Sequence, residues 1–278
     1  MKKIFVATDF SEVSVNAVHY AAALAKDFQS SLTLVHVYES PMFYTAEMPY
    51  TAIEAAEKMA KADAESKMEN LFQTVTTAYP ELSVKNIIRK GISADAISEE
   101  ADNNGADLLV SGSTGAGMLE RTLIGSTTTS LINKSKCHVL IVPANAKYKG
   151  IHQLIYATDL NDKNIAAINN MIPVAEKSNA EIVFLFVDNK IHTDSEEISE
   201  EMAHKIRSHV KYPKTSGYVC TDADIMNGIH IFINRMKADM VVMLTHPRSF
   251  PRMLWDKSLT KKFSYHPEIP LLVMHAHS

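Results

Sequence analysis

The residues of this chain best suited to bind a ligand are glycines gathered in one stretch. Four of the nine glycines fall between positions 112 and 125, after an apolar run and before a helical pattern. This places them at the carboxyl end of a buried strand, where α/β proteins bind ligands. Glycine lets main-chain N–H groups approach a phosphate without a Cβ in the way. The pattern favours a phosphate-binding loop, and the alternative is a loop of turn glycines without a ligand.

The start of the following helix adds to this interpretation. Gly125, Ser126 and Thr127 open that helix, and the first N–H groups of a helix lie at the positive end of its dipole and attract anions. Three better-known loops do not fit. A P-loop needs a lysine before its Ser or Thr, and here glycine precedes Ser126. The dinucleotide fingerprint and the SGG loop of pyrophosphatases would follow the first strand, where Thr8–Ser11 contains no glycine.

The chain also repeats itself, which decides its domain organisation. The matching segments, in order, are 3–10 with 153–160, 32–37 with 182–187, 106–110 with 238–242, and 139–143 with 270–274. The shift falls along the chain, so the second copy carries a deletion. A chain of 278 residues is also long for one core. We therefore predict two domains, 1–146 and 147–278.

Within each copy, strand-like apolar runs alternate with helical patterns. In the first copy we expect strands at 3–8, 32–38, 84–89, 107–111 and 138–142, and helices after Ser11 and at 51–79, 93–104 and 123–135. The second copy follows the same order, with a shorter second helix at about 195–211 and with Pro173 interrupting the first. This alternation predicts an α/β fold: two tandem domains, each a five-stranded parallel sheet with helices on both faces, doubly wound.

The spacing Gly112-x2-Gly115-x9-Gly125-Ser126 resembles the ATP-binding signature of the universal stress protein family. Asp9 ends the first strand, as in that family. The run 134–143 ends in the Val-Pro pair of the family's last strand. The resemblance covers the whole chain as two copies, and it implies a doubly wound fold similar to that of the adenine nucleotide α-hydrolases.

The resemblance also implies a ligand, namely ATP, or ADP or AMP, often with a divalent ion such as Mg²⁺. Asp9 would lie against the adenosine part and the main chain of Val37 against adenine, while the loop would hold the ribose and the phosphates. Ala7 stands where many members have proline. The expected site residues are Ala7, Asp9, Val37, Gly112, Ser113, Gly115, Gly125, Ser126 and Thr127.

The second copy departs from this signature. Its equivalent loop, 244–252, contains no glycine, and Pro247 and Pro251 supply no N–H donor. Its two arginines could hold another anion, although a solvated basic loop is the more ordinary interpretation. Asp159 is retained and could serve only to cap or orient the next helix. We therefore expect ATP to bind in the first domain alone.

Composition and patterning exclude several other classes. A net charge of −4 favours neither nucleic acid nor an anionic membrane as the main partner. Asp9 and Glu12 interrupt the first apolar run too early for a signal peptide, and no run approaches the ~20 apolar residues of a membrane span. We expect a cytoplasmic protein in which Cys137 and Cys220 are buried free thiols.

These observations lead to a functional expectation with open alternatives. The first is a regulatory nucleotide-binding protein of the stress response, acting with an unknown partner protein and without a catalytic residue. The others are a slow ATP hydrolase or ATP-dependent transferase, and a ligand-free interaction scaffold. By resemblance, strands 138–142 and 270–274 would pair within the chain as an internal pseudo-dimer, and two chains would associate as a homodimer.

Overall fold

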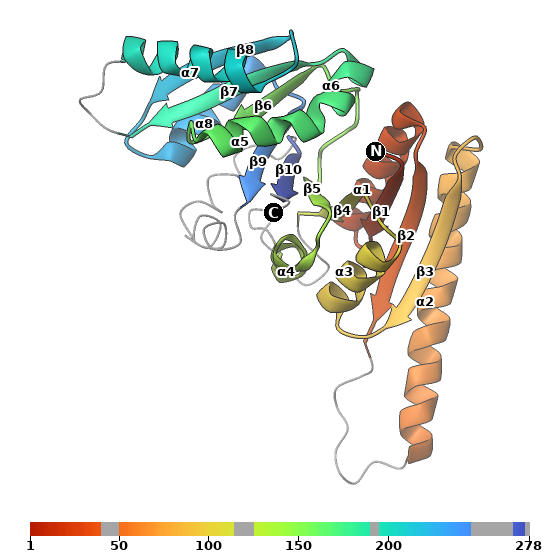
Figure 1. The fold of residues 1–278 in the computed structure, drawn as a ribbon. Coiled ribbons are helices and arrows are strands. Elements are labelled where there is room, and N and C mark those ends of the chain that lie inside the picture. The colour runs from red at the N-terminus through yellow and green to blue at the C-terminus, as the bar shows by residue number, and fades with distance from the viewer. Residues whose placement is uncertain (40–49, 114–124, 190–194, 246–268, 276–278) are drawn as a thin grey trace. The chain divides into compact units, whose positions relative to one another are not determined.

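The computed structural model describes residues 1–39, 50–113, 125–189, 195–245 and 269–275. Among these, the chain divides into two compact units between Ala144 and Asn145, here called unit 1 and unit 2 (Figure 1). The division lies close to the repeat-derived boundary between residues 146 and 147. That the first domain binds ATP and the second does not stays a prediction.

Unit 1 alternates strands and helices throughout. Its strands are β1 (Lys3–Ala7), β2 (Ser31–Tyr38), β3 (Val84–Lys90), β4 (Leu108–Gly112) and β5 (His138–Val142). Its helices are α1 (Glu12–Phe28), α2 (Tyr50–Ala78), α3 (Ser93–Asn103) and α4 (Ser126–Lys134). The strands are all parallel, in the order β3-β2-β1-β4-β5. The chain adds β2 and β3 on one side of β1 and then β4 and β5 on the other. Because the crossovers are right-handed, this reversal places helices on both faces of the sheet, with α1 beside α2 and α3 beside α4.

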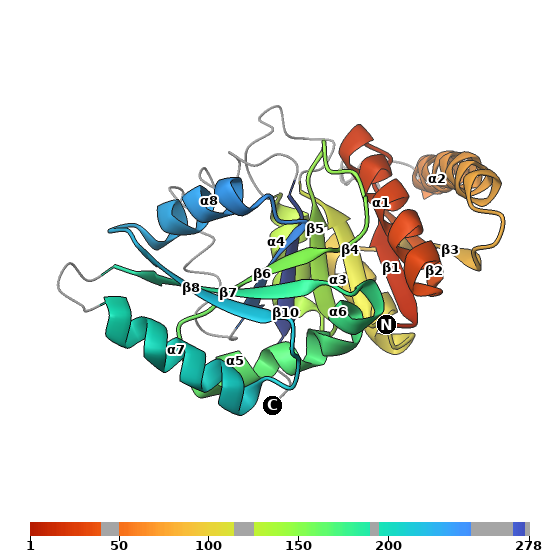
Figure 2. The same cartoon turned by 90° about the horizontal axis from the view of Figure 1, so that it is seen from above.

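Unit 2 has the same architecture. Its strands are β6 (Gln153–Ala157), β7 (Glu181–Asp188), β8 (Thr215–Thr221), β9 (Met240–Thr245) and β10 (Leu271–His275), in the parallel order β8-β7-β6-β9-β10. Its helices are α5 (Asp162–Ala167), α6 (Ile172–Ser178), α7 (Ser195–His209) and α8 (Ile225–Met236), and Figure 2 shows them around the strands. The predicted fold class is confirmed: each unit is a doubly wound five-stranded parallel sheet.

The first helix of unit 2 is interrupted where Pro173 predicted a break. After α5, a single 3-10 turn spans Ile168–Met171, and α6 then begins with Pro173 in its first turn. Proline is tolerated there because the first N–H groups of a helix have no intrahelical acceptor. In unit 1 the equivalent helix, α1, is continuous over 17 residues.

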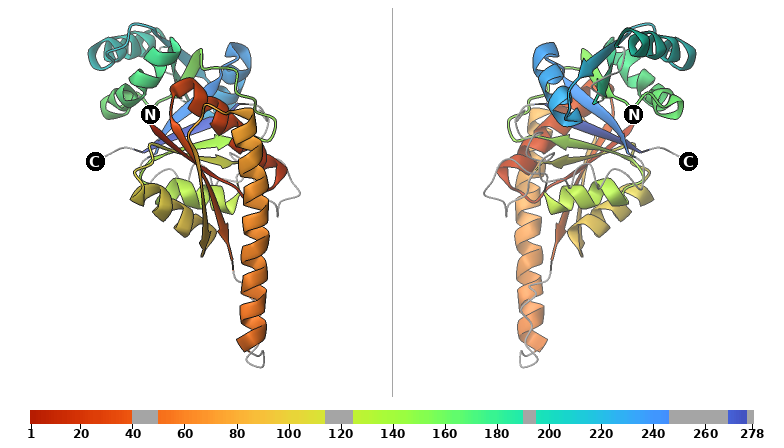
Figure 3. Two further views of the ribbon diagram at one scale, coloured as in Figure 1. Left: turned by 90° about the vertical axis from the view of Figure 1, so that its right-hand side faces the viewer. Right: turned by 90° about the vertical axis from the view of Figure 1, so that its left-hand side faces the viewer.

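Helix α2 is the longest element, with 29 residues. Figure 3 shows it running beyond the ends of the neighbouring strands. Its buried positions are confined to the second half, at Ala64, Met68, Leu71 and Val75, at the three- and four-residue spacing of one helix face. No helix among the described residues combines the length and the apolar character that crossing a bilayer requires.

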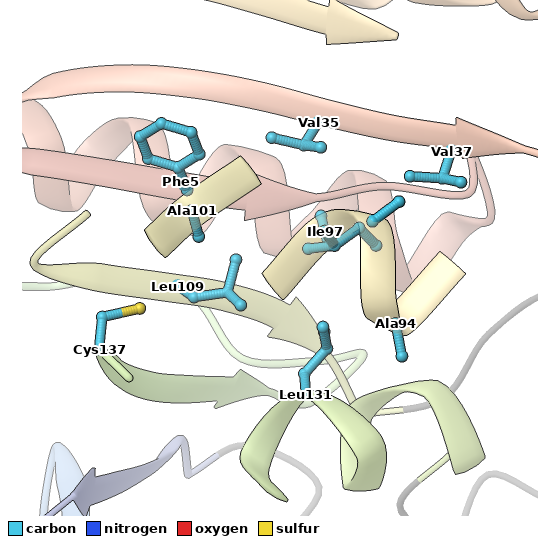
Figure 4. Packing of buried hydrophobic residues seen from close by; sticks show 11 residues of the cluster. Phe5, Val35, Val37, Ala94, Ile97, Ala101, Leu109, Leu131 and Cys137 are labelled. Atoms are coloured by element: carbon cyan, nitrogen blue, oxygen red, sulfur yellow. The ribbon is translucent and has the colours of Figure 1, made fainter. Parts of the chain in front are cut away.

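One apolar cluster lies between the sheet of unit 1 and the helices α3 and α4 (Figure 4). Its members are Phe5, Ala7, Val35, Val37, Ala94, Ala96, Ile97, Ala101, Leu109, Leu131 and Cys137. They come from the strands β1, β2 and β4, from the two helices and, for Cys137, from the connection just before β5. Burial of these side chains fixes the carboxyl ends of the strands relative to the start of α4.

Both cysteines are free thiols, as expected. Cys137 is buried in this cluster, and burial, with the negative charge of Asp102 nearby, raises its pKa to about 12. Its thiol is therefore protonated and unreactive at neutral pH. Cys220 on β8 is only partly buried, so the expectation of burial was wrong for this thiol, because β8 is an edge strand.

Candidate functional site

The turn after β1 is held by hydrogen bonds to two neighbouring elements. The Thr8 N–H donates to the Val35 carbonyl of β2 (2.9 Å). The Thr8 hydroxyl accepts from the Phe10 N–H (3.1 Å) and bonds the Ser14 hydroxyl on α1 (3.1 Å). Phe10 lies in the left-handed region at φ 64°, which costs a bulky residue about 1–3 kcal/mol and persists only where the surroundings enforce it. These bonds supply that enforcement.

Asp9 lies on this turn with its side chain exposed. Its Oδ1 accepts from the N–H (3.0 Å) and the hydroxyl (2.6 Å) of Ser11. The Ser11 hydroxyl in turn accepts from the Ser14 N–H (3.3 Å) and caps α1, as predicted. The direction of the Asp9 carboxylate is therefore set by the start of α1.

Strand β2 continues past the end of β1. Ala7, the last residue of β1, pairs with Val35, while the Tyr38 carbonyl of β2 accepts from Gly91 beyond β3 (3.2 Å). Because main-chain groups alternate along a strand, the N–H and C=O of Val37 point to the β1 side, beyond its last residue. The Val37 side chain is buried in the core. Val37 thus offers main-chain groups only, which is what its predicted role requires.

The carboxyl end of β4 is joined directly to the start of α4. The Ser113 N–H donates to the Val142 carbonyl of β5 (3.0 Å), and the Ser113 carbonyl accepts from the Gly125 N–H (2.7 Å). Gly125 is the N-cap of α4, and its carbonyl accepts the first helical bond, from Thr129 (2.9 Å). Both ends of the glycine loop are therefore fixed to the sheet.

The start of α4 carries no side-chain cap. Gly125 has no hydroxyl or carboxylate with which to accept from the first-turn N–H groups, whereas Ser11 does so in α1. Ser126 and Thr127 are exposed in that first turn. Their N–H groups, their hydroxyls and the positive end of the helix dipole together form a place where an anion is stabilised.

Gly112 has a structural reason to lack a side chain. A Cβ at this position would lie 3.1 Å from Val13 Cγ1 and 3.3 Å from the Val13 main chain. Its carbonyl accepts from the Thr128 hydroxyl (2.8 Å), which also bonds Ser111 Oγ (3.1 Å). Gly112 therefore lets the end of β4 approach the start of α1. Thr128 and Ser111 are buried and join α4 to β4 through their hydroxyls, and neither was among the predicted site residues.

Eight of the nine predicted site residues lie within the described part of the chain. They gather at the carboxyl end of the unit 1 sheet, at the ends of β1, β2 and β4 and at the start of α4. They are Ala7, Asp9, Val37, Gly112, Ser113, Gly125, Ser126 and Thr127. The side chain of Ala7 is buried in the core, so this residue reaches the site through its main chain. Gly115 lies outside the described residues, as do positions 246–252 of the second copy's loop.

His36 on β2 is a further residue that the sequence interpretation did not assign to the site. Its Nδ1 lies 2.8 Å from the Thr8 carbonyl, and its ring centroid lies 4.3 Å from that of Phe10. Burial lowers the pKa of the imidazole, so it is neutral at pH 7 and can donate its Nδ1 proton to Thr8. The one signal in the sequence is a histidine between two valines of a mainly apolar strand.

Unit 2 retains the same turn after β6. The Thr158 N–H donates to the Leu185 carbonyl (3.0 Å), and Leu160, at φ 61°, donates to the Thr158 hydroxyl (3.3 Å). The Asp159 carboxylate accepts from the Asn161 N–H (3.0 Å). As expected, Asp159 orients the first helical segment of its unit.

Comparison with known proteins places this arrangement in a family. The sequence model of the universal stress protein family matches residues 1–143. A universal stress protein of Methanocaldococcus jannaschii is 32% identical over 143 residues, which are 51% of this chain and 81% of the relative. One of Synechocystis is 32% identical over 142 residues, 51% of this chain and 85% of the relative.

A solved structure extends the likeness in fold to both units. A universal stress protein from Archaeoglobus fulgidus covers 99% of this chain and 97% of its own, with a TM-score of 0.71 at 16% identity. At that identity the match shows the shared fold alone. The family match itself covers more than half of the chain and all the predicted site residues, and on that evidence the chain belongs to the universal stress protein family.

Proposed function

We propose that unit 1 binds an adenine nucleotide, ATP or its products ADP and AMP, and acts as a regulatory module of the stress response whose bound state a partner protein reads. The observation that carries this proposal is the uncapped start of α4. Gly125 and Ser113 fix it at the same sheet edge as Asp9 and Val37. An anion site and a main-chain donor–acceptor pair thus lie at one end of one sheet.

The two parts of the site suit the two parts of a nucleotide. The N–H and C=O of Val37 complement an acceptor beside a donor, such as N1 and N6 of adenine. The exposed carboxylate of Asp9 can accept from a ribose hydroxyl. The first turn of α4 suits phosphate, with each dipole contact contributing about 0.3–2 kcal/mol. Several such contacts with adenine burial are compatible with a Kd near 1 μM, about −8 kcal/mol.

We propose this role for unit 1 alone. The support comes from the sequence of 244–252, where Pro247 and Pro251 replace main-chain donors and no glycine is present. The rate of steady-state ATP turnover separates this regulatory role from that of an ATP-dependent enzyme. Steady-state turnover well below 1 s⁻¹, under typical enzyme values, fits a regulator, and faster turnover fits an enzyme.

The test begins with the purified full-length chain. Denaturation followed by mass spectrometry should release an adenine nucleotide, and calorimetric titration of the stripped protein should give micromolar binding of ATP. Titrations with ADP, AMP and adenosine rank the ligands, and repeating them with and without Mg²⁺ decides whether the ion takes part. Absence of bound nucleotide, together with no heat at millimolar ATP, would contradict the proposal.

A further inference from the structure

The peptide group that joins Thr8 to Asp9 is held at both of its ends. Its carbonyl faces His36 Nδ1 at 2.8 Å. Its N–H donates to the Ser14 hydroxyl at 3.3 Å. A peptide unit is planar, so fixing its oxygen and its nitrogen fixes the direction of the N–Cα bond of Asp9. The following peptide is held as well, because the Phe10 N–H donates to the Thr8 hydroxyl. Between these two fixed peptides, the Cα–Cβ bond of Asp9 leaves the turn in one direction.

Unit 2 provides an internal comparison, because it forms the same turn without these two bonds. Phe186 occupies the place of His36 in the strand register and has no polar atom to donate. Asn164 takes the place of Ser14 and donates its amide to the Asp159 carboxylate instead (2.6 Å). A lysine, Lys205, holds the turn through the Leu160 carbonyl (2.8 Å). The left-handed turn therefore does not depend on a histidine.

His36 nevertheless carries a cost that an apolar side chain would avoid. It is partly buried on the face of β2 that it shares with the fully buried Leu34, because side chains alternate between the two faces of a strand. A polar group in such a place is unfavourable unless it is hydrogen-bonded. The fold alone does not account for it, since Phe186 serves the same fold in unit 2. Residues that break a local rule in this way are expected where function requires them.

We propose that His36 is a positioning residue of the nucleotide site: with Ser14 it locks the Thr8–Asp9 peptide so that Asp9 meets the nucleoside part of the ligand. This inference rests on the proposed function of unit 1. It predicts that His36 acts through Asp9 and not through the phosphates, because the start of α4 is held by separate bonds, from Ser113.

The test compares His36→Phe, which copies unit 2, with His36→Asn, whose side-chain amide can place a donor near the position of Nδ1. In calorimetric titrations at pH 7.5, His36→Phe should lose about tenfold in affinity, the worth of one hydrogen bond. The loss should be the same for adenosine as for ATP, and His36→Asn should recover most of it. Thermal unfolding of each variant checks the fold, and His204→Asn, an exposed histidine on α7, is the matched control.

Ser14→Ala provides a second approach should His36→Phe unfold, since it releases the other end of the same peptide and should weaken both ligands alike. Unchanged affinity in His36→Phe, or no recovery in His36→Asn, would overturn the role of His36. A loss restricted to ATP would overturn it as well. Failure of the wild-type chain to bind either ligand is a different result and removes the proposed function together with this inference.

Discussion

At the scale of single residues, the starts of α1 and α4 in unit 1 differ in whether the N-cap side chain accepts from a helical N–H group. Ser11 closes the start of α1 with its hydroxyl. Gly125 leaves the start of α4 without such a cap. The N–H groups of a helix start are satisfied by a side chain, by water or by a ligand. At α4 the N-cap residue supplies no side-chain acceptor, so among the described residues the place is left to water or a ligand. The N-cap side chain thus distinguishes α4 from α1. The start of α3 lacks a side-chain cap as well, and α4 differs from it in its glycine N-cap and in the exposed hydroxyls of Ser126 and Thr127.

The exposed Thr127 allows this to be tested without disturbing the core. Thr127→Glu places a negative charge in the first turn of α4, where the helix dipole stabilises it by about 0.3–1 kcal/mol. The same charge repels a triphosphate. We expect the melting temperature to stay level or rise slightly while the affinity for ATP falls at least about tenfold. Titration with adenosine should show little change.

The neutral counterpart, Thr127→Gln, separates charge from size. It should keep most of the ATP affinity, because it adds a side chain of similar length without the repulsion. Equal losses of ATP affinity in both Thr127 variants would point to a steric effect and against an anion at this helix start.

At the scale of elements, one carboxylate in each unit joins two neighbouring strands at the amino end of the sheet by accepting hydrogen bonds from the main chain. The Asp107 carboxylate, just before β4, accepts from the N–H groups of Lys2 and Lys3 at the start of β1. In unit 2 the Asp239 carboxylate does the same for His152 and Gln153. Both aspartates follow an alanine in the matched segments of the repeat. The two copies thus set the register of their central strands by the same device, at the edge opposite to the site.

Asp107→Asn tests this device and its pH dependence. Partial burial alone would raise the pKa of Asp107, but the bonds from Lys2 and Lys3 bring it below its usual value of 3.8. A carboxylate with a lowered folded pKa contributes stability that is present above 3.8 and is lost as the pH falls through the lower folded pKa. The variant should cost about 1 kcal/mol at pH 7.

Urea unfolding between pH 7 and pH 3 measures this difference. The gap between wild type and Asp107→Asn should narrow below pH 4, as the wild-type carboxyl takes up its proton. Glu54→Gln, at an exposed position on α2, should show no such gap. A gap that stays constant down to pH 3 would mean that the charge of Asp107 does not contribute.

The elements themselves were predictable from the sequence, since each depends on local periodicity and on helix-stop residues. The strands came out where apolar runs placed them, and α2 ends at Ala78, just before Pro80, as predicted. For α4 the two predictions differed: the helical pattern placed its start near 123, whereas the glycine motif placed it at Gly125–Thr127, and the helix begins at Ser126 after its Gly125 cap. The roles of His36 and Thr128 were not predictable, because each acts through a partner distant in the chain. The partners of Ser14 are close in the chain, but its role depends on the left-handed turn that brings Thr8 and Asp9 back to it.

At the scale of the whole molecule, a duplicated fold lets one copy serve as the control for the other. Both units build the same left-handed turn after their first strands, with Asp9 and Asp159 in equivalent places. They differ in what surrounds it: His36 with Ser14 in unit 1, and Phe186 with Asn164 in unit 2. Because both units form the turn, the residues that differ around it are not required by the fold, and a role of His36 in binding can be tested against unit 2.

This pairing gives the last prediction, in which Asp9→Asn and Asp159→Asn are compared in the full-length chain. Each removes the charge from a carboxylate that accepts the N–H two residues later, so the two structural costs should be similar and the melting temperatures should fall by similar amounts. If unit 1 alone binds the nucleotide, calorimetry of the wild type should give one ATP per chain. Asp9→Asn should then weaken binding about tenfold or more, and Asp159→Asn should leave both stoichiometry and affinity unchanged. Two ATP per chain, or an equal loss from both substitutions, would show that the second copy binds as well, because only a ligand in unit 2 would make Asp159 matter for affinity.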